Sequence, residues 1–355
     1  MALKSLKCTD FRCLRSVELS FGSQNNLIYG PNASGKTSIL EAVGYLGRGR
    51  SFRGASTQEL VRHDADEFVL FGRADNGSRE ESLGVRNSRA GLEVHTNGEK
   101  RNSAAALAEA LPLQVIDPDI HSLIAGGPED RRRYIDWIAF HVEHGYLDRW
   151  RRFRRALKQR NAALKSGASR QALSGWDQEL AELGIDIDDV RRRMLDITRP
   201  ALEEYGEALL GSQIDFEYQR GWAGEKTLLE ALEGSTERDL QMGSTQPGPH
   251  RADIRLRYDE RQAKKLVSRG QQKLLACALI LAATDVVQTQ LERPLLLLLD
   301  DPAAELDGDS LARLMGAVAN LGSQVIATTL EPDRALFVEP PLLFHVEQGV
   351  VERAG

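Results

Sequence analysis

The chain has 355 residues, enough for two or three domains, and 41% of them are hydrophobic, which suffices for a buried core. Three cysteines without nearby histidine partners argue against a zinc site and against a disulfide framework. The formal net charge of −6, taken alone, speaks against nucleic acid as a partner. The N-terminus has no apolar signal core and no run approaches about 18 apolar residues, so we expect a soluble, cytoplasmic protein that does not bind membranes.

Residues 1–125 are predicted to form the first part of an α/β head. Short strands separated by turns are expected over 14–21, 67–73, 91–96 and 113–116. Leu27 to Tyr29 should form a further strand, and a helix should begin with the segment from Thr37 to Val43.

The segment between that strand and that helix predicts a phosphate-binding loop. It reads Gly30-Pro31-Asn32-Ala33-Ser34-Gly35-Lys36-Thr37 and fits the pattern G-x-x-x-x-G-K-[ST]. The glycines let successive backbone N–H groups curl round a β-phosphate, and the helix N-terminus adds positive potential. We expect Lys36 to reach the β- and γ-phosphates of ATP, Thr37 to bind Mg²⁺, and Ser38 to belong to the ATP site. The alternative is a glycine-rich turn followed by a surface lysine.

A short basic stretch, residues 48–53, follows this helix. It contains Arg48, Arg50 and Arg53. It could touch DNA, touch nucleotide or be a plain loop, and the sequence leaves this choice open.

Residues 126–244 are predicted to form an inserted, mainly helical second lobe. After the turn Gly126-Gly127-Pro128, helices are expected over 129–165 and 171–210, with a Ser/Gly break at 166–169. Residues 131–170 contain 12 Lys and Arg and 3 Asp and Glu, a net +9 that leaves −15 for the other 315 residues. Charge concentrated in one element is typical of contacts with a phosphate backbone.

The arginines of this lobe are therefore candidates for DNA binding. The candidates are Arg131, Arg132, Arg151, Arg152, Arg154 and Arg155. For the run from Arg149 to Arg155, the alternative is an exposed amphipathic helix whose arginines are only solvated. Trp150 and Phe153, spaced i, i+3, lie on one helix face and are expected to pack inward.

Residues 245–355 are predicted to complete the head. A turn at 245–250 precedes a strand over 252–258, a long apolar helix over 271–291 and a core strand over 324–329. Another strand, Leu295 to Leu299, ends in Asp300-Asp301. Asp300 is expected to hold Mg²⁺ through its water shell, and Asp301 to orient or deprotonate the attacking water. The alternative is a strand-ending Asp-Asp-Pro turn.

A third element of the predicted nucleotide site lies just before the long helix. It reads Ser268-Arg269-Gly270-Gln271-Gln272. With the phosphate loop and the aspartate strand, in this order and spacing, it describes an ATPase head of the ABC type, in which two subunits share the nucleotide. In such heads this element faces outward, so we expect Ser268, Gly270 and Gln271 to bind a γ-phosphate held by a second copy of the chain.

The chain resembles the RecF family over essentially its whole length. The most specific segment runs from Pro118 to Asp136 and reads PDIHSLIAGGPEDRRRYID. Further matching segments are Asp10-Phe11-Arg12, residues 49–53, Gly248-Pro249-His250-Arg251, residues 268–273, Asp300-Asp301 and Glu305-Leu306-Asp307.

This resemblance implies roles that the residues alone do not show. Arg12 would lie by the adenine or the α-phosphate, Gln114 would couple Mg²⁺ and the attacking water to the second lobe, and Thr329 would hydrogen-bond the γ-phosphate. Asp301 stands where most relatives have the longer glutamate, which implies slow hydrolysis. The resemblance also implies an ATP-induced homodimer on gapped or duplex DNA, weak DNA-stimulated ATPase activity, and a function in gap repair and recombination with RecR, RecO and RecA.

One departure from the family affects the loop, and two other classes of protein compete. Ala33 stands where the family usually has glycine, so we expect the φ angle of this residue to stay negative. An ABC transporter subunit would have its Ser-x-Gly-Gln element much sooner after the phosphate loop. An SMC-type chromosome protein needs a long coiled-coil arm, although a short-armed relative that binds DNA stays an alternative.

Overall fold

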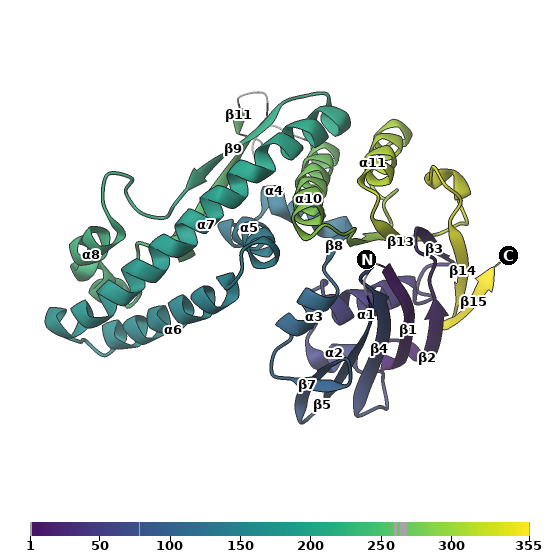
Figure 1. Cartoon of the computed structure of the whole chain (residues 1–355), viewed down its shortest axis with the longest axis horizontal. Coiled ribbons are helices and arrows are strands. Elements are labelled where there is room, and N and C mark those ends of the chain that lie inside the picture. The colour runs from purple at the N-terminus through teal and green to yellow at the C-terminus, as the bar shows by residue number, and fades with distance from the viewer. Residues whose placement is uncertain (1, 78, 259–260, 263–267, 355) are drawn as a thin grey trace. The chain divides into compact units, whose positions relative to one another are not determined.

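The computed structural model describes residues 2–77, 79–258, 261–262 and 268–354 (Figure 1). The chain divides into two compact units, residues 1–120 with 273–355, called the head, and residues 121–272, called the arm lobe. The arm lobe therefore extends beyond the expected limits of 126 and 244. The strand β10 (Asp253–Tyr258) was expected in the head, but it pairs with β9 (Ile214–Gln219), which keeps the segment after residue 244 in the arm lobe.

A mostly parallel sheet carries the carboxyl-end edge on which the head's functional residues lie. Its strand order is β15-β14-β3-β13-β12-β8. The bounds are β3 Asn25–Tyr29, β8 Leu113–Ile116, β12 Leu296–Asp300, β13 Gln324–Thr329, β14 Leu342–Glu347 and β15 Val350–Ala354. Among the described strands of this sheet, only β15 pairs antiparallel, with β14. Every residue of β12 is buried, as expected for a leucine run covered on both faces of a sheet.

A second, antiparallel sheet completes the head, and its strand order is β2-β1-β4-β5-β6-β7. The bounds are β1 Ala2–Phe11, β2 Leu14–Ser20, β4 Glu67–Asp75, β5 Glu80–Ser88, β6 Gly91–Thr96 and β7 Glu99–Arg101. Burial alternates along β4, so one face packs inward. Phe68 of that face contacts Phe11 and Tyr45 edge-on. The helix α1 (Lys36–Arg48) and both sheets contribute side chains to one hydrophobic cluster, which is the core of the head.

Four further helices and a short 3₁₀ turn belong to the head. The bounds are α2 Thr57–Leu60, α3 Ala105–Ala110, α10 Arg269–Leu291, α11 Gly308–Leu321 and the turn Arg334–Leu336. The first four residues of α10, 269–272, fall within the arm lobe. By length and composition α10 could cross a membrane, but most of its most apolar stretch is buried inside the protein. That burial accounts for its apolar composition.

The arm lobe is mainly helical, with a three-stranded sheet of order β11-β10-β9. Its helices are α4 Ser122–Ala125, α5 Pro128–Val142, α6 Tyr146–Lys165, α7 Arg170–Leu210 and α8 Leu228–Met242, and β11 is Arg261–Gln262. Two 3₁₀ turns, Pro118–His121 and Pro249–Arg251, precede α4 and β10. The expected single helix over 129–165 is wrong, because the chain breaks before Gly145, which adopts a left-handed φ of 78°. The helices α6 and α7 lie side by side (Figure 1).

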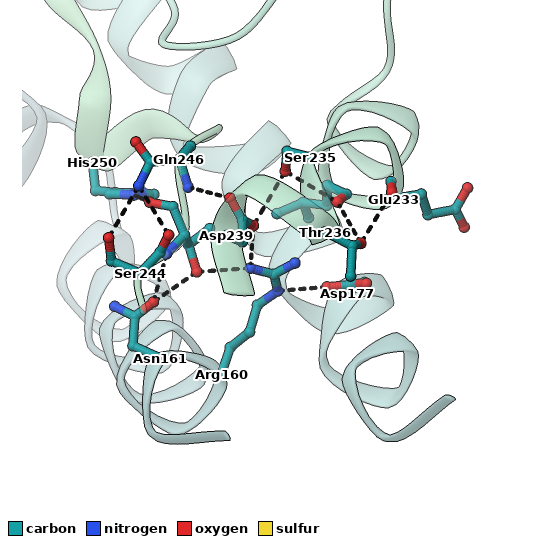
Figure 2. A network of polar contacts seen from close by, with 12 residues as sticks. Arg160, Asn161, Asp177, Glu233, Ser235, Thr236, Asp239, Ser244, Gln246 and His250 are labelled. Carbon is teal, nitrogen blue, oxygen red and sulfur yellow. Dashed lines mark hydrogen bonds and ion pairs between the residues drawn. The ribbon is translucent and has the colours of Figure 1, made fainter. Parts of the chain in front are cut away.

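A buried arginine fixes the segment that leads into β10 (Figure 2). Arg160 of α6 has no exposed surface and donates to Asp177 at 2.6 Å, to Asp239 at 2.6 Å and to Thr245 Oγ1 at 2.9 Å. Asn161 Oδ1 accepts the backbone N–H of Thr245 at 2.8 Å. A buried charge without such partners is strongly unfavourable, so breaking these contacts would destabilise the lobe. The contacts therefore hold residues 245–251 against α6, α7 and α8.

His250 belongs to the same segment, and we predict that its ionisation makes the arm lobe sensitive to acid. Its Nε2 lies 3.0 Å from the carbonyl oxygen of Thr245, and burial lowers the pKa of His250 to about 4. Between pH 6.5 and 4 the unfolded chain therefore binds a proton that the folded chain does not. This proton lowers the free energy of unfolding as pH falls, by about 1.4 kcal/mol for each pH unit.

Urea unfolding followed by tryptophan fluorescence at pH 7.5 and pH 5 measures this effect in the arm lobe alone, because all four tryptophans lie there. A His250→Gln variant, which cannot take up the proton, should lose less stability between the two pH values than the wild type. Equal losses in both proteins would show that other groups cause the acid sensitivity.

Candidate nucleotide-binding site

A cavity of about 310 Å³ opens at the carboxyl end of the parallel sheet. Its lining residues are Cys13, Asn32, Ala33, Ser34, Gly35, Lys36, Thr37, Ser38, Arg53, Asp300, Asp301, Thr328 and Leu330. The strands β3, β12 and β13 are parallel neighbours, so the segments that follow them meet at one edge of the sheet. The structure thus places the phosphate loop beside the aspartate pair, although 263 positions separate Thr37 from Asp300.

The phosphate loop has the backbone conformation that its glycines allow. Gly30 and Gly35 adopt φ angles of 153° and 113°, and a Cβ atom on Gly30 would lie 2.1 Å from the carbonyl oxygen of Val346. Ala33 also has a positive φ, of 61°, so the expectation of a negative φ is wrong. The left-handed conformation costs alanine about 1–2 kcal/mol, which the surrounding loop must offset.

The side chain of Lys36 folds back over the phosphate loop and contacts its backbone. Its ammonium donates to the carbonyl oxygens of Gly30 and Pro31, both at 2.8 Å. Burial lowers the pKa of Lys36, while the charges of Asp301 and Asp300 oppose that shift. A cation held over a curled backbone at a helix N-terminus is an arrangement suited to phosphate.

Two hydroxyl groups converge on one oxygen of Asp300. Thr37 Oγ1 donates to Asp300 Oδ1 at 3.0 Å, and Thr328 Oγ1 donates to the same oxygen at 2.8 Å. A carboxylate and a threonine hydroxyl beside a phosphate loop are hard oxygen donors, so these residues fit a Mg²⁺ ion. Asp301 lies in the cavity with a left-handed φ of 49°, and burial, followed by the charge of Asp300, raises its pKa.

Gln114, expected to be a metal ligand and a catalytic residue, is not among the residues that line this cavity, so the structure gives neither role any support. It pairs with Leu297, three residues before Asp300 along the parallel strands, a separation of about 10 Å. Its Oε1 accepts a hydrogen bond from Arg48 at 3.1 Å. Asp117, which follows β8, is the nearer group: burial and the charges of Asp119 and Asp300 raise its pKa to about 6.

The guanidinium of Arg12 forms an ion pair with a carboxylate and does not line the cavity. Its expected place by the nucleotide is therefore not supported. It pairs with buried Glu41 through two hydrogen bonds of 2.9 and 3.0 Å. Ser51 also bonds Glu41, and Ser51 Oγ accepts the backbone N–H of Arg53 at 3.0 Å. Arg53 lines the cavity, so the stretch 48–53 contributes a cation there. Arg53 was not predicted to be a site residue, and its place in the basic stretch 48–53 was the feature of the sequence that could have indicated it.

Thr329 was expected to bond the γ-phosphate, but Thr328 lines the cavity instead. The hydroxyl of Thr329 donates to the carbonyl oxygen of Glu331 at 2.6 Å. Neighbouring residues of a strand point to opposite faces, so the side chains of Thr328 and Thr329 have different surroundings.

The Ser-x-Gly-Gln element lies at the start of α10. Ser268 Oγ accepts the backbone N–H of Gln271 at 3.3 Å, and Gln271 Oε1 accepts the backbone N–H of Ser268 at 2.9 Å. This reciprocal pair is a capping box. Ser268 and Arg269 are exposed, whereas Gly270, Gln271 and Gln272 are half-buried, so the N-terminus of α10 is accessible in a single copy.

The candidate DNA-binding arginines differ in their environment. Arg131 is buried, pairs with Asp253 at 2.8 and 3.2 Å and donates to the carbonyl oxygen of Gly126 at 3.1 Å, so its expected contact with DNA is not supported. Arg132 is half-buried and donates to the carbonyl oxygen of Ala252 at 2.7 Å, which makes it a structural contact as well.

Four of the six arginines of α6 are exposed. They are Arg151, Arg152, Arg154 and Arg155. Carboxylates lie 3.4 Å from Arg151 and 3.8 Å from Arg152. Phe153 is fully buried, which confirms that it packs inward, and it stacks on half-buried Trp150 at 5.6 Å between ring centroids.

Comparison with known proteins decides the family. The family model RecF/RecN/SMC N terminal domain matches residues 2–348. The DNA replication and repair protein RecF of Shewanella pealeana is 39% identical over 356 residues, which cover 99% of both chains. The protein of the same name from Shewanella loihica is 40% identical over 357 residues, with the same coverage. The chain belongs to the RecF family.

Solved structures agree with this membership of the RecF family. A structure of the recombination mediator protein RecF with ATP has a TM-score of 0.91 at 26% identity and covers 100% of this chain and 98% of that one. A structure of an Smc head bound to the C-winged helix domain of ScpA has a TM-score of 0.62 at 17% identity, which shows the fold alone. The predicted ABC-type ATPase head is thereby confirmed.

Proposed function

We propose that this RecF-family chain is a cytoplasmic, ATP-dependent DNA-binding protein of DNA replication and repair. The observation that carries the proposal is the hydrogen bond of 3.0 Å between Thr37 and Asp300 at the mouth of a phosphate loop. It joins a hydroxyl and a carboxylate that suit Mg²⁺ at the place where the γ-phosphate of ATP would lie. The relatives named RecF, one of them solved with ATP, support this reading.

In the proposed mechanism each residue of the cavity has a distinct task. Lys36 and the N–H groups at the start of α1 bind the phosphates, and Thr37 and Asp300 hold Mg²⁺, which when bound neutralises phosphate charge. Asp301 orients the attacking water and accepts its proton. Its raised pKa strengthens it as a base, but the short side chain reaches less far than glutamate would. We infer slow hydrolysis that serves as a switch.

The switch would act on a dimer and on DNA. ATP held by the loop of one copy would be contacted by Ser268, Gly270 and Gln271 of a second, and hydrolysis would release the pair. The exposed arginines of α6 would contact the phosphate backbone of gapped or duplex DNA. The name RecFOR pathway, given for the structure of a similar RecF, supports RecO and RecR as partners. We further propose that the three proteins load the recombinase RecA.

Replacing the four exposed arginines of α6 by alanine is predicted to weaken DNA binding. They are Arg151, Arg152, Arg154 and Arg155. Because phosphate contacts carry no sequence information, affinity should fall alike for all DNA sequences. The slope of log affinity against log salt concentration should flatten by about 3 to 4 if all four contacts are lost. Fluorescence anisotropy with gapped, duplex and single-stranded DNA, with ATP and with ADP, measures both quantities.

A control variant changes the net charge by the same amount as the α6 variant does. It replaces four exposed arginines of the head, Arg73, Arg79, Arg86 and Arg89, by alanine. This variant should bind DNA with nearly the wild-type affinity and salt slope. Equal losses in the two variants would indicate a general charge effect, and unchanged binding by the α6 variant would make its arginines a solvated helix face.

A further inference from the structure

Thr328 connects the two aspartates of the proposed ATP site. It lies on β13, is 1% exposed, and is paired in parallel register with Asp300 of β12. Its hydroxyl donates to Asp300 Oδ1 at 2.8 Å and accepts the backbone N–H of Asp301 at 3.0 Å. One buried side chain therefore touches both consecutive residues.

The two bonds have different consequences for the two aspartates. At Asp300, the hydroxyls of Thr37 and Thr328 both donate to Oδ1, which fixes the carboxylate plane and directs Oδ2 away from them. At Asp301, the bond from the backbone N–H to Thr328 Oγ1 stabilises a left-handed backbone conformation. This conformation costs about 1–2 kcal/mol for a residue that has a side chain. Without Thr328 Oγ1, this partly buried N–H would lose its acceptor.

The hydroxyl is also well suited to this pair of bonds by its chemistry. A threonine hydroxyl has one proton to donate and lone pairs to accept, and both capacities are used here. Its β-branched side chain has few accessible rotamers, so the orientation of the hydroxyl is well defined. Valine has nearly the same shape and neither capacity.

We propose that Thr328 is a positioning residue, which sets the Asp300 carboxylate for the divalent cation and fixes Asp301 for the attacking water. This inference rests on the proposed function, because it assigns a role within the same ATP site. Thr328 acts through the two aspartates and not by contact with the reacting atoms. Groups that orient metal ligands typically change metal affinity or activity by about 10- to 100-fold when they are replaced.

The test measures binding separately from hydrolysis. The affinity for a fluorescent, non-hydrolysable ATP analogue is determined with Mg²⁺ and with EDTA for the wild type and for Thr328→Val. We expect equal affinities in EDTA, a gain from Mg²⁺ that is about tenfold smaller in the variant, and ATP hydrolysis reduced about 100-fold. Thr328→Ser, which restores the hydroxyl, should recover both quantities to within about threefold of the wild type.

Two further substitutions discriminate the proposal from a loss of packing. Thr284→Val removes another buried hydroxyl of the head, one that donates to the carbonyl oxygen of Ile280, and should leave ATP binding and hydrolysis unchanged. Thr329→Val tests the neighbouring residue. If Thr329→Val loses the Mg²⁺-dependent gain and Thr328→Val keeps it, the assignment is wrong.

The outcomes also separate this inference from the function on which it rests. A wild type whose ATP affinity does not depend on Mg²⁺ would overturn the proposed function itself. A wild type with such dependence and a Thr328→Val variant with the same dependence would overturn only the role of Thr328. If Thr328→Val melts earlier than Thr284→Val, Thr328→Ala and Thr328→Ser are compared at a temperature at which both are folded, and equal Mg²⁺ gains in these two would contradict the proposal.

Discussion

Lys36→Ala is expected to weaken ATP binding at least about 100-fold while the head stays folded. The ammonium of Lys36 donates to two carbonyl oxygens of the phosphate loop, and we assign it to the β- and γ-phosphates of ATP. Charge-assisted hydrogen bonds contribute about 1.5–3 kcal/mol each, and losing two of them accounts for this factor. Isothermal titration with ATP and Mg²⁺ measures the affinity, and a thermal melt of each protein checks folding.

The matched control is Asp301→Asn, which removes a charge of opposite sign from the same cavity. It should retain ATP affinity, because Asp301 is assigned to the attacking water and not to the phosphates, and it should lose hydrolysis. Normal ATP affinity in a folded Lys36→Ala protein would refute the phosphate-loop assignment. Wild-type turnover by Asp301→Asn would instead move the water-orienting role to another carboxylate, with Glu305 as the next candidate.

The sequence predicted those parts of the site whose chemistry is contained in one short segment. The phosphate loop is recognised from eight consecutive residues, and the leucine run before Asp300 predicts a buried strand by composition alone. Because parallel strands end at one edge, the proximity of the loop and the aspartates could be expected as well. These expectations could be made without knowing how individual side chains are oriented in the folded protein.

The site residues that the structure does not support are those whose surroundings depend on a distant partner. Gln114 and Thr329 are on the expected strands, but strand register and direction place one beside Arg48 and the other beside Glu331. Arg131 belongs to the basic run by composition, yet its carboxylate partner Asp253 lies 122 positions away. Counting charges cannot separate such an arginine from an exposed one.

The boundary of the arm lobe shows the same dependence on distant pairing. The sequence predicts that the turn at 245–250 marks the return to the head and that a strand follows it. The strand β10 that follows pairs with β9 of the arm lobe, and the arginine network of α6 holds the turn itself. Since β9 was not predicted, the sequence offered no partner for β10 outside the head.

The proposed dimer depends on the N-terminus of α10. In a single copy Ser268 is exposed and its hydroxyl is engaged only in the capping box with Gln271 among the described contacts. An accessible helix N-terminus offers positive potential and backbone N–H groups to an anion. We infer that the γ-phosphate of ATP bound to a second copy occupies this position, so that ATP joins the two subunits.

Ser268→Arg is predicted to bind ATP as the wild type does and to remain a monomer. The long charged side chain would occupy the space that the partner's phosphate needs, while Lys36 and its loop are unchanged. Sedimentation velocity at micromolar protein with saturating ATP and Mg²⁺ measures the outcome, and the wild type should sediment as a dimer. Mixing Ser268→Arg with Lys36→Ala should restore at most one of the two shared sites.

Replacing Ser268 also removes a helix cap, which costs about 1 kcal/mol, and this effect needs its own control. Thr227→Arg makes the same kind of change at the capping box of α8, where Thr227 is exposed and pairs with Glu230. It should dimerise with ATP as the wild type does, because no shared site is assigned to α8. If Ser268→Arg also dimerises, or if the wild type stays monomeric with saturating ATP, the shared site does not exist and Ser268 is only a helix cap.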